Sequence, residues 1–241
     1  MAIYTSKTKI DLEDVGYSNK ITNKAILKIL ENAGARQSET IHFGLNDMEN
    51  VGFSWILLGW KVKILKRPIY NEELTINTWG RDSNRIFTYR DYEIYDESGE
   101  LCTIATSKWA IVDINTGKLR ELTPEIIEKY QCETKKVFEE DYTLKLKEPV
   151  TIIRKQEYKA QRRDIDINKH IHNLYYLDYA YEALPEEVYE APECNNIEIM
   201  YKKQIRLNDE FKCLYTKEEN QNIVTMKSED ENTLHAIIKL Y

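Results

Sequence analysis

The sequence predicts an α+β fold made of two similar halves, each with one helix and several long antiparallel strands. Apolar residues recur at helical spacing at 26–33 and again at 174–184. The turn-like sequence Asn-Glu-Glu-Leu at 71–74 is echoed by Asn-Asp-Glu-Phe at 208–211. This repeat is too long for a solenoid and fits a duplicated domain.

In the first half, a helix is expected to begin after Thr22, whose hydroxyl suits an N-cap, and to end before Gly34. Four strand-like stretches follow, at 55–65, 74–79, 86–95 and 101–113. The sequence Asp-Glu-Ser-Gly at 96–99 predicts a hairpin between the last two. This half therefore reads as one helix wrapped by an antiparallel sheet.

The second half repeats this order after a less regular stretch. We expect an N-terminal domain at 1–130, a linker at 131–149 and a C-terminal domain at 150–241. The charged run at 135–141 has the composition of a solvated face. A strand-like stretch from Val150 leads to a helix that ends at Pro185, and further strands are expected at 197–205, 223–228 and 234–241.

Composition and charge exclude several classes of protein. A chain of 241 residues can bury a substantial core, and 17 tyrosines against 8 glycines and 5 prolines favour strands over a loop-rich scaffold. A net charge of −7 argues against general nucleic-acid binding, which needs a positive face. No glycine-rich phosphate loop is found, so we expect no nucleotide site.

Cysteine usage and the chain start favour a cytoplasmic location. The cysteines at 102, 132, 194 and 213 show no metal-ligand spacing, and no secretory signal or Arg- and Ser-rich transit segment precedes them. No apolar run approaches the roughly 20 residues that span a bilayer. We therefore expect reduced thiols in an unprocessed chain without a membrane span.

The densest group of proton-handling side chains lies at 164–173, directly before the second helix. It holds two carboxylates, two carboxamides and two imidazoles. Asp166, Asn168 and His170 recur at a spacing of two, so in an extended or looping backbone they can point the same way. An imidazole can act as a general base, and a carboxamide can orient a carbonyl or a water.

The N-terminus of the helix after this motif is a second feature suited to catalysis. Its free N–H groups and positive dipole end, near 170–173, can hold a developing oxyanion. The stretch is therefore suited to attack on a carbonyl. A structural alternative stays open, in which Asp166 and Asn168 make only turn and capping hydrogen bonds and His170 is a satisfied buried histidine.

The run Asp-x-Asn-x-His-x-x-Asn-x-x-Tyr, from Asp166 to Tyr176, resembles the motif of the acyl-acyl carrier protein thioesterases of plants and bacteria. Other segments are similar to family segments in the same order: Trp55 to Trp60, Tyr89 to Asp96 and Trp109 to Asp113. The resemblance covers nearly the whole chain. It implies two tandem hotdog domains, each a long helix wrapped by an antiparallel sheet, that form a pseudo-dimer.

Only the second half carries the polar cluster. The equivalent region of the first half, 14–23, has Asn19 and Asn23 but no histidine. The resemblance therefore implies that the first domain contributes mainly the acyl-chain pocket. Trp55, Leu57, Leu58 and Trp60 are the candidates for lining it, because such pockets are mostly apolar, although the same residues suit a plain core.

The resemblance implies hydrolysis of fatty acyl-acyl carrier protein to free fatty acid and holo-acyl carrier protein, which ends fatty acid synthesis. No cofactor of the enzyme's own is implied, because the substrate carries the phosphopantetheine. His170 is the expected general base or acid, Asn168 orients the carbonyl or His170, and Asp166 supports them. Attack by water and attack through a covalent intermediate both stay open.

One departure from the family pattern bears on this mechanism. Where family members commonly have Tyr-basic-basic-Glu-Cys after the helix, this chain has Tyr-Lys-Lys-Gln-Ile at 201–205. Ile205 rules out a thiol nucleophile there, and Gln204 retains only a polar orienting group. We therefore place Gln204 in the catalytic set, prefer water attack assisted by His170, and expect a slower enzyme.

Acyl carrier protein is acidic, so its docking surface should be basic. Arg162, Arg163 and Lys169 are the foremost candidates, and Lys155, Lys202 and Lys203 also flank the motif. The competing interpretation is a set of solvated surface charges with little energetic weight.

Three other functions compete with this interpretation. An acyl-CoA thioesterase would share the chemistry and differ in the carrier, and a non-catalytic acyl-binding or regulatory protein would fit the missing Glu and Cys. Hydration or dehydration fits the Asp-Asn-His grouping less well. His170 and His172 lack a third metal ligand, so we expect no metal. Chain-length and branching preference and oligomeric state, including a homodimer, stay open.

Overall fold

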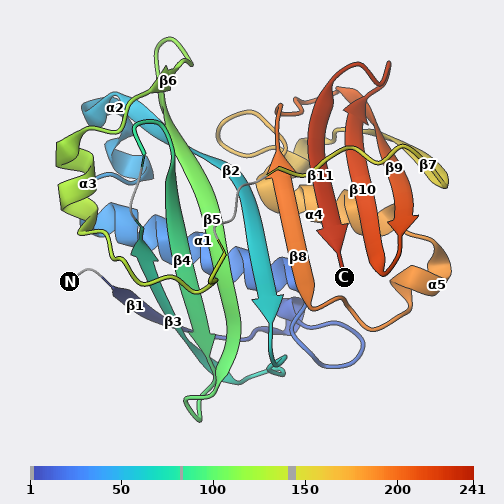
Figure 1. The fold of residues 1–241 in the computed structure, drawn as a ribbon, viewed down its shortest axis with the longest axis horizontal. Coiled ribbons are helices and arrows are strands. Elements are labelled where there is room, and N and C mark those ends of the chain that lie inside the picture. The colour runs from blue at the N-terminus through green and yellow to red at the C-terminus, as the bar shows by residue number, and fades with distance from the viewer. Residues whose placement is uncertain (1–2, 82–83, 141–144) are drawn as a thin grey trace. The chain divides into compact units, whose positions relative to one another are not determined.

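A computed structural model describes residues 3–81, 84–140 and 145–241. The chain divides into two compact units, which we call unit 1 (1–143) and unit 2 (144–241). Figure 1 shows that each unit contains a helix and a set of strands. The predicted α+β class, with a helix and an antiparallel sheet in each half, is confirmed.

In unit 1, α1 lies against a sheet with the strand order β1-β3-β4-β5-β2, and β6 pairs with β5. All of these neighbours are antiparallel. The strands are β1 (Tyr4–Lys9), β2 (Phe53–Ile64), β3 (Glu73–Gly80), β4 (Thr88–Tyr95), β5 (Leu101–Asp113) and β6 (Leu119–Arg120). The helices are α1 (Asn23–Thr40), α2 (Met48–Val51) and α3 (Pro124–Tyr130).

In unit 2, the strand order is β8-β11-β10-β9-β7, again antiparallel throughout. The strands are β7 (Arg154–Lys159), β8 (Asn196–Tyr201), β9 (Glu210–Glu218), β10 (Gln221–Ser228) and β11 (Leu234–Leu240). The helices are α4 (Asn173–Glu182) and α5 (Glu186–Tyr189). A short 3-10 turn precedes the helix in both units, at Leu12–Asp14 and Arg162–Asp164.

Helix α1 begins as predicted and ends later than predicted. The side chain of Thr22 accepts the N–H of Ala25 at 3.2 Å, which confirms the N-cap. The helix does not end before Gly34 but continues to Thr40. A Cβ at Gly34 would lie 2.9 Å from the hydroxyl oxygen of Tyr92, so this glycine allows α1 to approach the sheet closely and does not end the helix.

Strand β2 keeps its large side chains on one face by means of a β-bulge. The register with β5 shifts between Leu57 and Gly59, which leaves Leu58 as the extra residue. The partners of Trp55, Leu57 and Trp60 on β5 are then two residues apart, so these three side chains share one face. Without the bulge, Trp60 would point to the opposite face.

The first part of the expected linker belongs to unit 1 and packs against its strands. The indole Nε1 of Trp79 donates to the carbonyl of Lys135 at 2.9 Å, and the N–H of Val137 donates to Asp91 Oδ2 at 3.0 Å. The ammonium of Lys135 lies 2.6 Å from Glu93 Oε1. Residues 135–137 are therefore held by side chains of β3 and β4.

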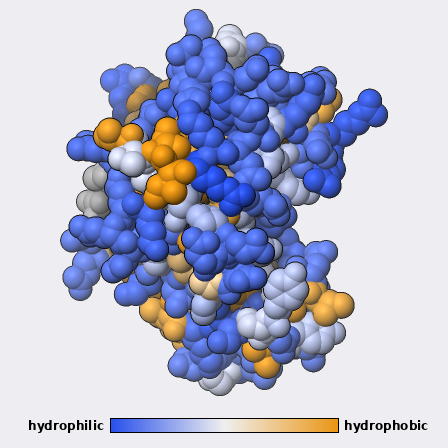
Figure 2. Space-filling view, turned by 90° about the vertical axis from the view of Figure 1, so that its right-hand side faces the viewer, coloured by the Kyte–Doolittle hydropathy of each residue, from blue (hydrophilic) through white to orange (hydrophobic). Residues whose placement is uncertain are grey.

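All four tryptophans of the chain belong to unit 1. They are Trp55, Trp60, Trp79 and Trp109. The face of the molecule drawn in Figure 2 is mostly hydrophilic, with small apolar clusters. Among the described residues, no helix combines the length and the apolar character needed to cross a membrane.

Candidate active site

The motif before α4 folds into a tight turn. The N–H of Asp166 donates to the carbonyl of His170 at 2.9 Å, and Lys169 adopts a left-handed φ of 63°. The Asp166 carboxylate accepts the N–H of Asn168 at 2.8 Å, and Asn168 Nδ2 lies 3.4 Å from its other oxygen. Of the two backbones that the sequence allows, extended and looping, the chain adopts the loop, and the Asp166 carboxylate makes hydrogen bonds within that turn.

A short antiparallel pairing fixes this turn against the segment after β8. The N–H of Ile171 donates to the carbonyl of Ile205 at 2.8 Å, and His170 forms an antiparallel bridge with Arg206. The N–H of Ile205 donates to the hydroxyl of Tyr176 on α4 at 3.2 Å. Both backbone groups of Ile205 are therefore used to hold the motif and the helix together.

This pairing joins two buried isoleucines whose sequence neighbours are polar. Ile171 and Ile205 are 2% and 0% exposed. Their sequence neighbours His170, His172 and Gln204 are polar. His170 and His172 are half-buried and Gln204 is exposed. The pairing thus brings the segment that carries Gln204 alongside the segment that carries His170.

Burial lowers the pKa of His170 below the ordinary value of 6.5, and the positive charge of Arg206 acts in the same direction. The carboxylate of Asp166 opposes this shift. The imidazole of His170 is therefore neutral at pH 7 and offers a lone pair that can accept a proton.

The start of α4 uses some of the N–H groups that were expected to bind an oxyanion. His172 is the N-cap, and its Nδ1 accepts the N–H of Leu174 at 3.3 Å. The carbonyl of His172 accepts the N–H of Tyr175 at 2.9 Å. The first helical residue, Asn173, has no acceptor within its own helix and keeps its N–H directed out of the N-terminus. Fewer helix donors therefore remain for an oxyanion than the sequence implied.

One residue near the site was missed by the sequence reasoning. His235 on β11 is 6% exposed, and its Nδ1 lies 2.8 Å from the carbonyl of Lys203, so Nδ1 carries the proton. The N–H of Lys202 donates to the carbonyl of His235 at 2.8 Å. His235 therefore positions the segment that carries Gln204. Its only signal in the sequence is a single histidine within an apolar strand.

Unit 1 contains a turn with the same backbone hydrogen bonds as the motif turn but without its carboxylate and imidazole side chains. The N–H of Gly16 donates to the carbonyl of Lys20 at 3.0 Å, Asn19 has a φ of 57°, and the N–H of Ile21 donates to the carbonyl of Pro68 at 2.9 Å. These bonds match those of the motif turn one for one. The positions of Asp166, Asn168, His170 and Gln204 are occupied by Gly16, Ser18, Lys20 and Arg67.

The four candidate acyl-binding residues lie on β2. Trp60 is 1% exposed and packs against the ring of Tyr92, with the ring centroids 5.3 Å apart. Leu57 is buried, and Trp55 and Leu58 are half-buried. Their role in lining an acyl pocket stays a prediction.

The three candidate carrier-binding residues are exposed. Arg162 and Arg163 lie in the 3-10 turn before the motif, and Lys169 lies at the left-handed position of the motif turn. Arg163 Nε is 3.6 Å from Asp164 Oδ1. Contact with a carrier protein stays a prediction. Within residues 3–81, 84–140 and 145–241, no cluster of three or more potential metal ligands is present.

The two units have the hotdog fold, as comparison with solved structures shows. An acyl-ACP thioesterase from Bacteroides thetaiotaomicron superposes with a TM-score of 0.86 and 23% identity, over 99% of this chain and 97% of that one. The 12:0-ACP thioesterase from Umbellularia californica superposes with a TM-score of 0.84 and 17% identity, over 100% of this chain and 96% of that one. The chain is thus a tandem hotdog protein.

Sequence comparison places it more narrowly. The models of the acyl-ACP thioesterase N-terminal and C-terminal domains match residues 1–130 and 147–239, so the chain belongs to the acyl-ACP thioesterase family. Oleoyl-acyl carrier protein thioesterase 2 of Arabidopsis thaliana, a chloroplastic protein, is 25% identical over 238 residues. That match covers 92% of this chain and 65% of the relative, so the chain spans just under two thirds of the relative's length.

Proposed function

We propose that the chain hydrolyses the thioester between a fatty acyl group and acyl carrier protein, and so releases free fatty acid. The observation that carries this proposal is the half-buried imidazole of His170, held beside Asp166 and the start of α4 in a chain of this family. A neutral imidazole next to a helix N-terminus provides a base and an electrostatic site for an oxyanion.

In this mechanism, the oxygen of a water attacks the thioester carbonyl carbon while His170 accepts the proton of that water. The C–S bond then breaks, and His170 returns the proton to the departing thiolate of the carrier. Asn168 orients the carbonyl or the imidazole, and the N–H of Asn173 faces the oxyanion. The products are a fatty acid and holo-carrier protein, and no cofactor of the enzyme takes part.

Gln204 lies on the segment that pairs with the motif turn, but it cannot accept a proton as a carboxylate can. We assign it an orienting role toward the water or the imidazole. With Ile205 buried and its backbone fully bonded, no thiol is available at the adjacent position. Water attack and a slow turnover follow from this combination.

Carrier recognition is assigned to Arg162, Arg163 and Lys169. All three side chains are exposed near the motif, and an acidic carrier would be attracted to them. Because salt screens exposed charges, kcat/KM for an acyl-carrier substrate should fall with ionic strength. An acyl-CoA thioesterase would instead hydrolyse acyl-CoA at a comparable or higher rate.

The decisive experiment measures hydrolysis of a panel of acyl-acyl carrier proteins by the wild type, His170→Ala and Asn168→Ala. Loss of the general base should lower kcat by about 10²-fold or more. If the wild type turns over and both variants lose activity, the site is supported and the panel reports chain length. Full activity in both variants would place the chemistry elsewhere.

Gln204 and Ile205 favour one second candidate, a non-catalytic acyl-binding protein, because both positions lack the reactive group common in the family. That protein would bind acyl-carrier substrates tightly without turnover. Binding of a substrate that stays intact over long incubation would select this alternative.

A further inference from the structure

An arginine outside the motif lies directly opposite the candidate base. His170 and Arg206 form an antiparallel bridge, and the cross-strand bond beside them runs from the N–H of Ile171 to the carbonyl of Ile205. The N–H groups of His170 and Arg206 themselves donate to side-chain carboxylates of their own segments. The two residues therefore form a pair without mutual hydrogen bonds. In such a pair the opposite side chains share one face and come close together, with Cβ atoms roughly 4.5–5.5 Å apart.

The charge of Arg206 reaches the imidazole of His170. Burial is the main cause of the lowered pKa of His170; among charges, Asp166 raises this pKa and Arg206 lowers it. Asp166 and Asp209 are also the two carboxylates that act on the hydroxyl of Tyr176 on α4, whose pKa burial raises, so that this hydroxyl stays neutral. The guanidinium is therefore close enough to the candidate base to act on the same substrate.

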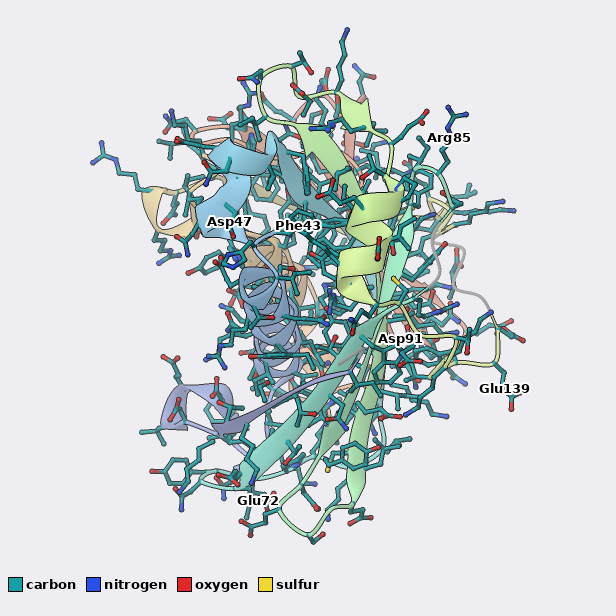
Figure 3. The ribbon with its side chains drawn as sticks, turned by 90° about the vertical axis from the view of Figure 1, so that its left-hand side faces the viewer. Phe43, Asp47, Glu72, Arg85, Asp91 and Glu139 are labelled. Atoms are coloured by element: carbon teal, nitrogen blue, oxygen red, sulfur yellow. The ribbon has the colours of Figure 1, made fainter. Side chains whose placement is uncertain are left out.

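The backbone at Arg206 does not require an arginine, because unit 1 builds the same pairing with an isoleucine. Lys20 and Ile69 form the corresponding antiparallel bridge. In unit 2 the N–H of Asp209 donates to the carbonyl of Arg206 at 3.1 Å. In unit 1 the N–H of Glu72, the residue directly before β3 (Figure 3), donates to the carbonyl of Ile69 at 3.3 Å. The side chain of Arg206 therefore calls for an explanation other than the local fold.

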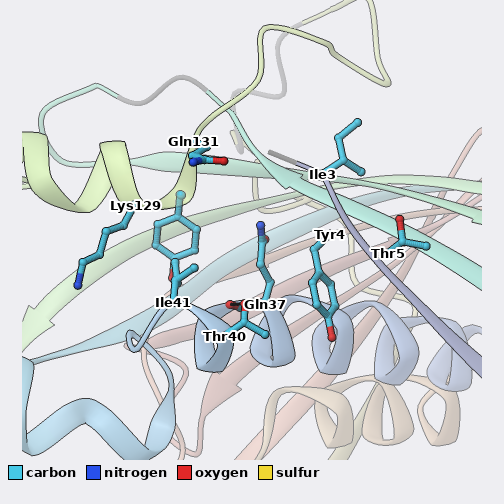
Figure 4. Close-up of a pocket in the computed structure, with 9 residues that line it drawn as sticks. Ile3, Tyr4, Thr5, Gln37, Thr40, Ile41, Lys129 and Gln131 are labelled. Carbon is cyan, nitrogen blue, oxygen red and sulfur yellow. Dashed lines mark hydrogen bonds between the residues drawn. The ribbon is translucent and has the colours of Figure 1, made fainter. Parts of the chain in front are cut away.

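Unit 1 provides no second copy of this pair. Its single histidine, His42, is exposed beyond the end of α1, with Nδ1 3.8 Å from Asp47 Oδ1. The pocket of unit 1 drawn in Figure 4, between β1, the end of α1 and the end of α3, has no histidine among its described lining residues. The combination of an imidazole with an opposite arginine is therefore specific to the unit that carries the motif.

Thioester hydrolysis creates negative charge beside the base. Charge develops on the carbonyl oxygen as water attacks and on the sulfur as the C–S bond breaks. Helix α4 offers few donors for this charge, because the N–H groups of Leu174 and Tyr175 are bonded to His172. A guanidinium has five N–H donors and a permanent charge. Next to the base, it can donate to the carbonyl oxygen while the base takes a proton from water.

We propose that Arg206 is a catalytic residue that donates hydrogen bonds to the thioester carbonyl oxygen and stabilises the oxyanion formed when water attacks. This role rests on the thioesterase function proposed for the chain. The water oxygen bonds to the carbonyl carbon, His170 takes the proton, and the electron pair of the C=O bond moves to the oxygen that Arg206 holds. When that pair returns, the C–S bond breaks and His170 gives the proton to the departing sulfur. Arg206 keeps its own proton throughout.

The kinetic test uses an acyl-carrier substrate and the carrier-free acyl-pantetheine thioester. Arg206→Gln should lower kcat on both by about 10²-fold, the low end for loss of an oxyanion donor, with little change in KM. Removing the cation should also raise the His170 pKa, so the acidic limb of the kcat/KM profile should move to higher pH. Arg206→Lys should keep the position of this limb and recover part of kcat. The control Lys217→Gln, which removes an exposed charge near the far end of β9, should change neither.

Two kinetic results would overturn the proposal. If Arg206→Gln raises KM for the acyl-carrier substrate alone and leaves acyl-pantetheine hydrolysis unchanged, Arg206 is a carrier contact. If it lowers activity together with the Tm, and the pH limb does not move, Arg206 has only a structural role.

A second measurement needs no turnover and uses decanoate, whose carboxylate places a negative oxygen where the oxyanion forms. In the wild type, decanoate should raise the His170 pKa measured by NMR, since a nearby anion favours the imidazolium. Arg206→Gln should bind decanoate at least about 10-fold more weakly, as expected for loss of a hydrogen bond between charged groups. Equal affinity in the two proteins would refute the role of Arg206 and leave the proposed function intact. A wild type that binds decanoate through Arg206 but hydrolyses neither thioester would refute the proposed function, and the catalytic role with it.

Discussion

At the scale of single residues, the site depends on the protonation state of His170. Burial keeps its pKa below 6.5, so the neutral base is the dominant form at pH 7. Asp166, which raises the pKa of His170, contributes less than burial does. The carboxylate therefore reduces the shift of the His170 pKa but does not hold the imidazole in the charged form.

The pH dependence of hydrolysis follows from this shift. We expect kcat/KM for an acyl-carrier substrate to rise with pH as His170 loses its proton, and the midpoint of this limb should lie below pH 6.5. Asp166→Asn removes the group that raises the pKa of His170, so the limb should move to still lower pH. A steady-state pH profile of both proteins checks this prediction, and a midpoint above pH 7 in the wild type would contradict it.

The proximity of the motif residues to one another was predictable because they lie close together in sequence. Asp166, Asn168 and His170 come together through one local turn, and their chemistry can be read from their side chains. The contribution of His235 was not predictable, because it acts on a segment 32 residues away, at Lys203. Such contacts are set by the fold and leave no local pattern.

At the scale of elements, helices α1 and α4 are N-capped by different kinds of side chain. Thr22 caps α1 with its hydroxyl, and His172 caps α4 with Nδ1. The backbone around each cap is also alike. The N–H of Thr22 donates to the backbone carbonyl of Asp14 at 2.9 Å, and the N–H of His172 donates to the backbone carbonyl of Asp164 at 2.8 Å.

This equivalence predicts the outcome of two substitutions. His172→Thr should leave the free energy of unfolding nearly unchanged, because threonine already caps α1 in the same backbone setting. His172→Ala should lower it by about 1 kcal/mol through loss of the cap. Urea unfolding followed by far-UV circular dichroism measures both. Equal destabilisation by Thr and Ala would show that the imidazole stabilises the chain by something other than capping.

Element boundaries were predictable where local chemistry decides them and not where packing does. Strand β5 has the predicted bounds, and Thr22 caps α1 as predicted. The sequence predicts a helix end at Gly34, but the close approach of Tyr92 to the helix explains this glycine. Strand β9 was missed because its exposed ends are charged, although Phe211 and the residues around it are buried.

At the scale of the whole molecule, the two units differ in their titrating histidines and in their fluorescent tryptophans. His170 and His235, both in unit 2, have pKa values lowered by burial, while every tryptophan belongs to unit 1. Acid should therefore affect unit 2 in a way that tryptophan fluorescence does not report directly.

The stability of unit 2 should fall as the pH drops below 6.5. For a histidine whose folded pKa is lowered, protonation favours the unfolded chain, so the stabilisation is fully present above the unfolded pKa and is lost as the pH falls through the folded pKa. Thermal unfolding from pH 7.5 to 5 should show a larger decrease in Tm by far-UV circular dichroism than by tryptophan fluorescence. His235→Asn, which retains a donor for Lys203, should reduce that decrease. An equal decrease in Tm by circular dichroism and by tryptophan fluorescence would contradict the assignment of the acid sensitivity to unit 2.

The turn that occurs in both units also provides an internal reference for hydrogen exchange. The amides of Ile21 and Ile171 sit in the same backbone setting, each bonded to a carbonyl of the segment after a strand. Their exchange rates, measured in one sample, share temperature, solvent and pH, so their ratio isolates what differs between the two turns. A substrate held by His170 would slow only the second amide, and the ratio would report occupancy of the site without any label.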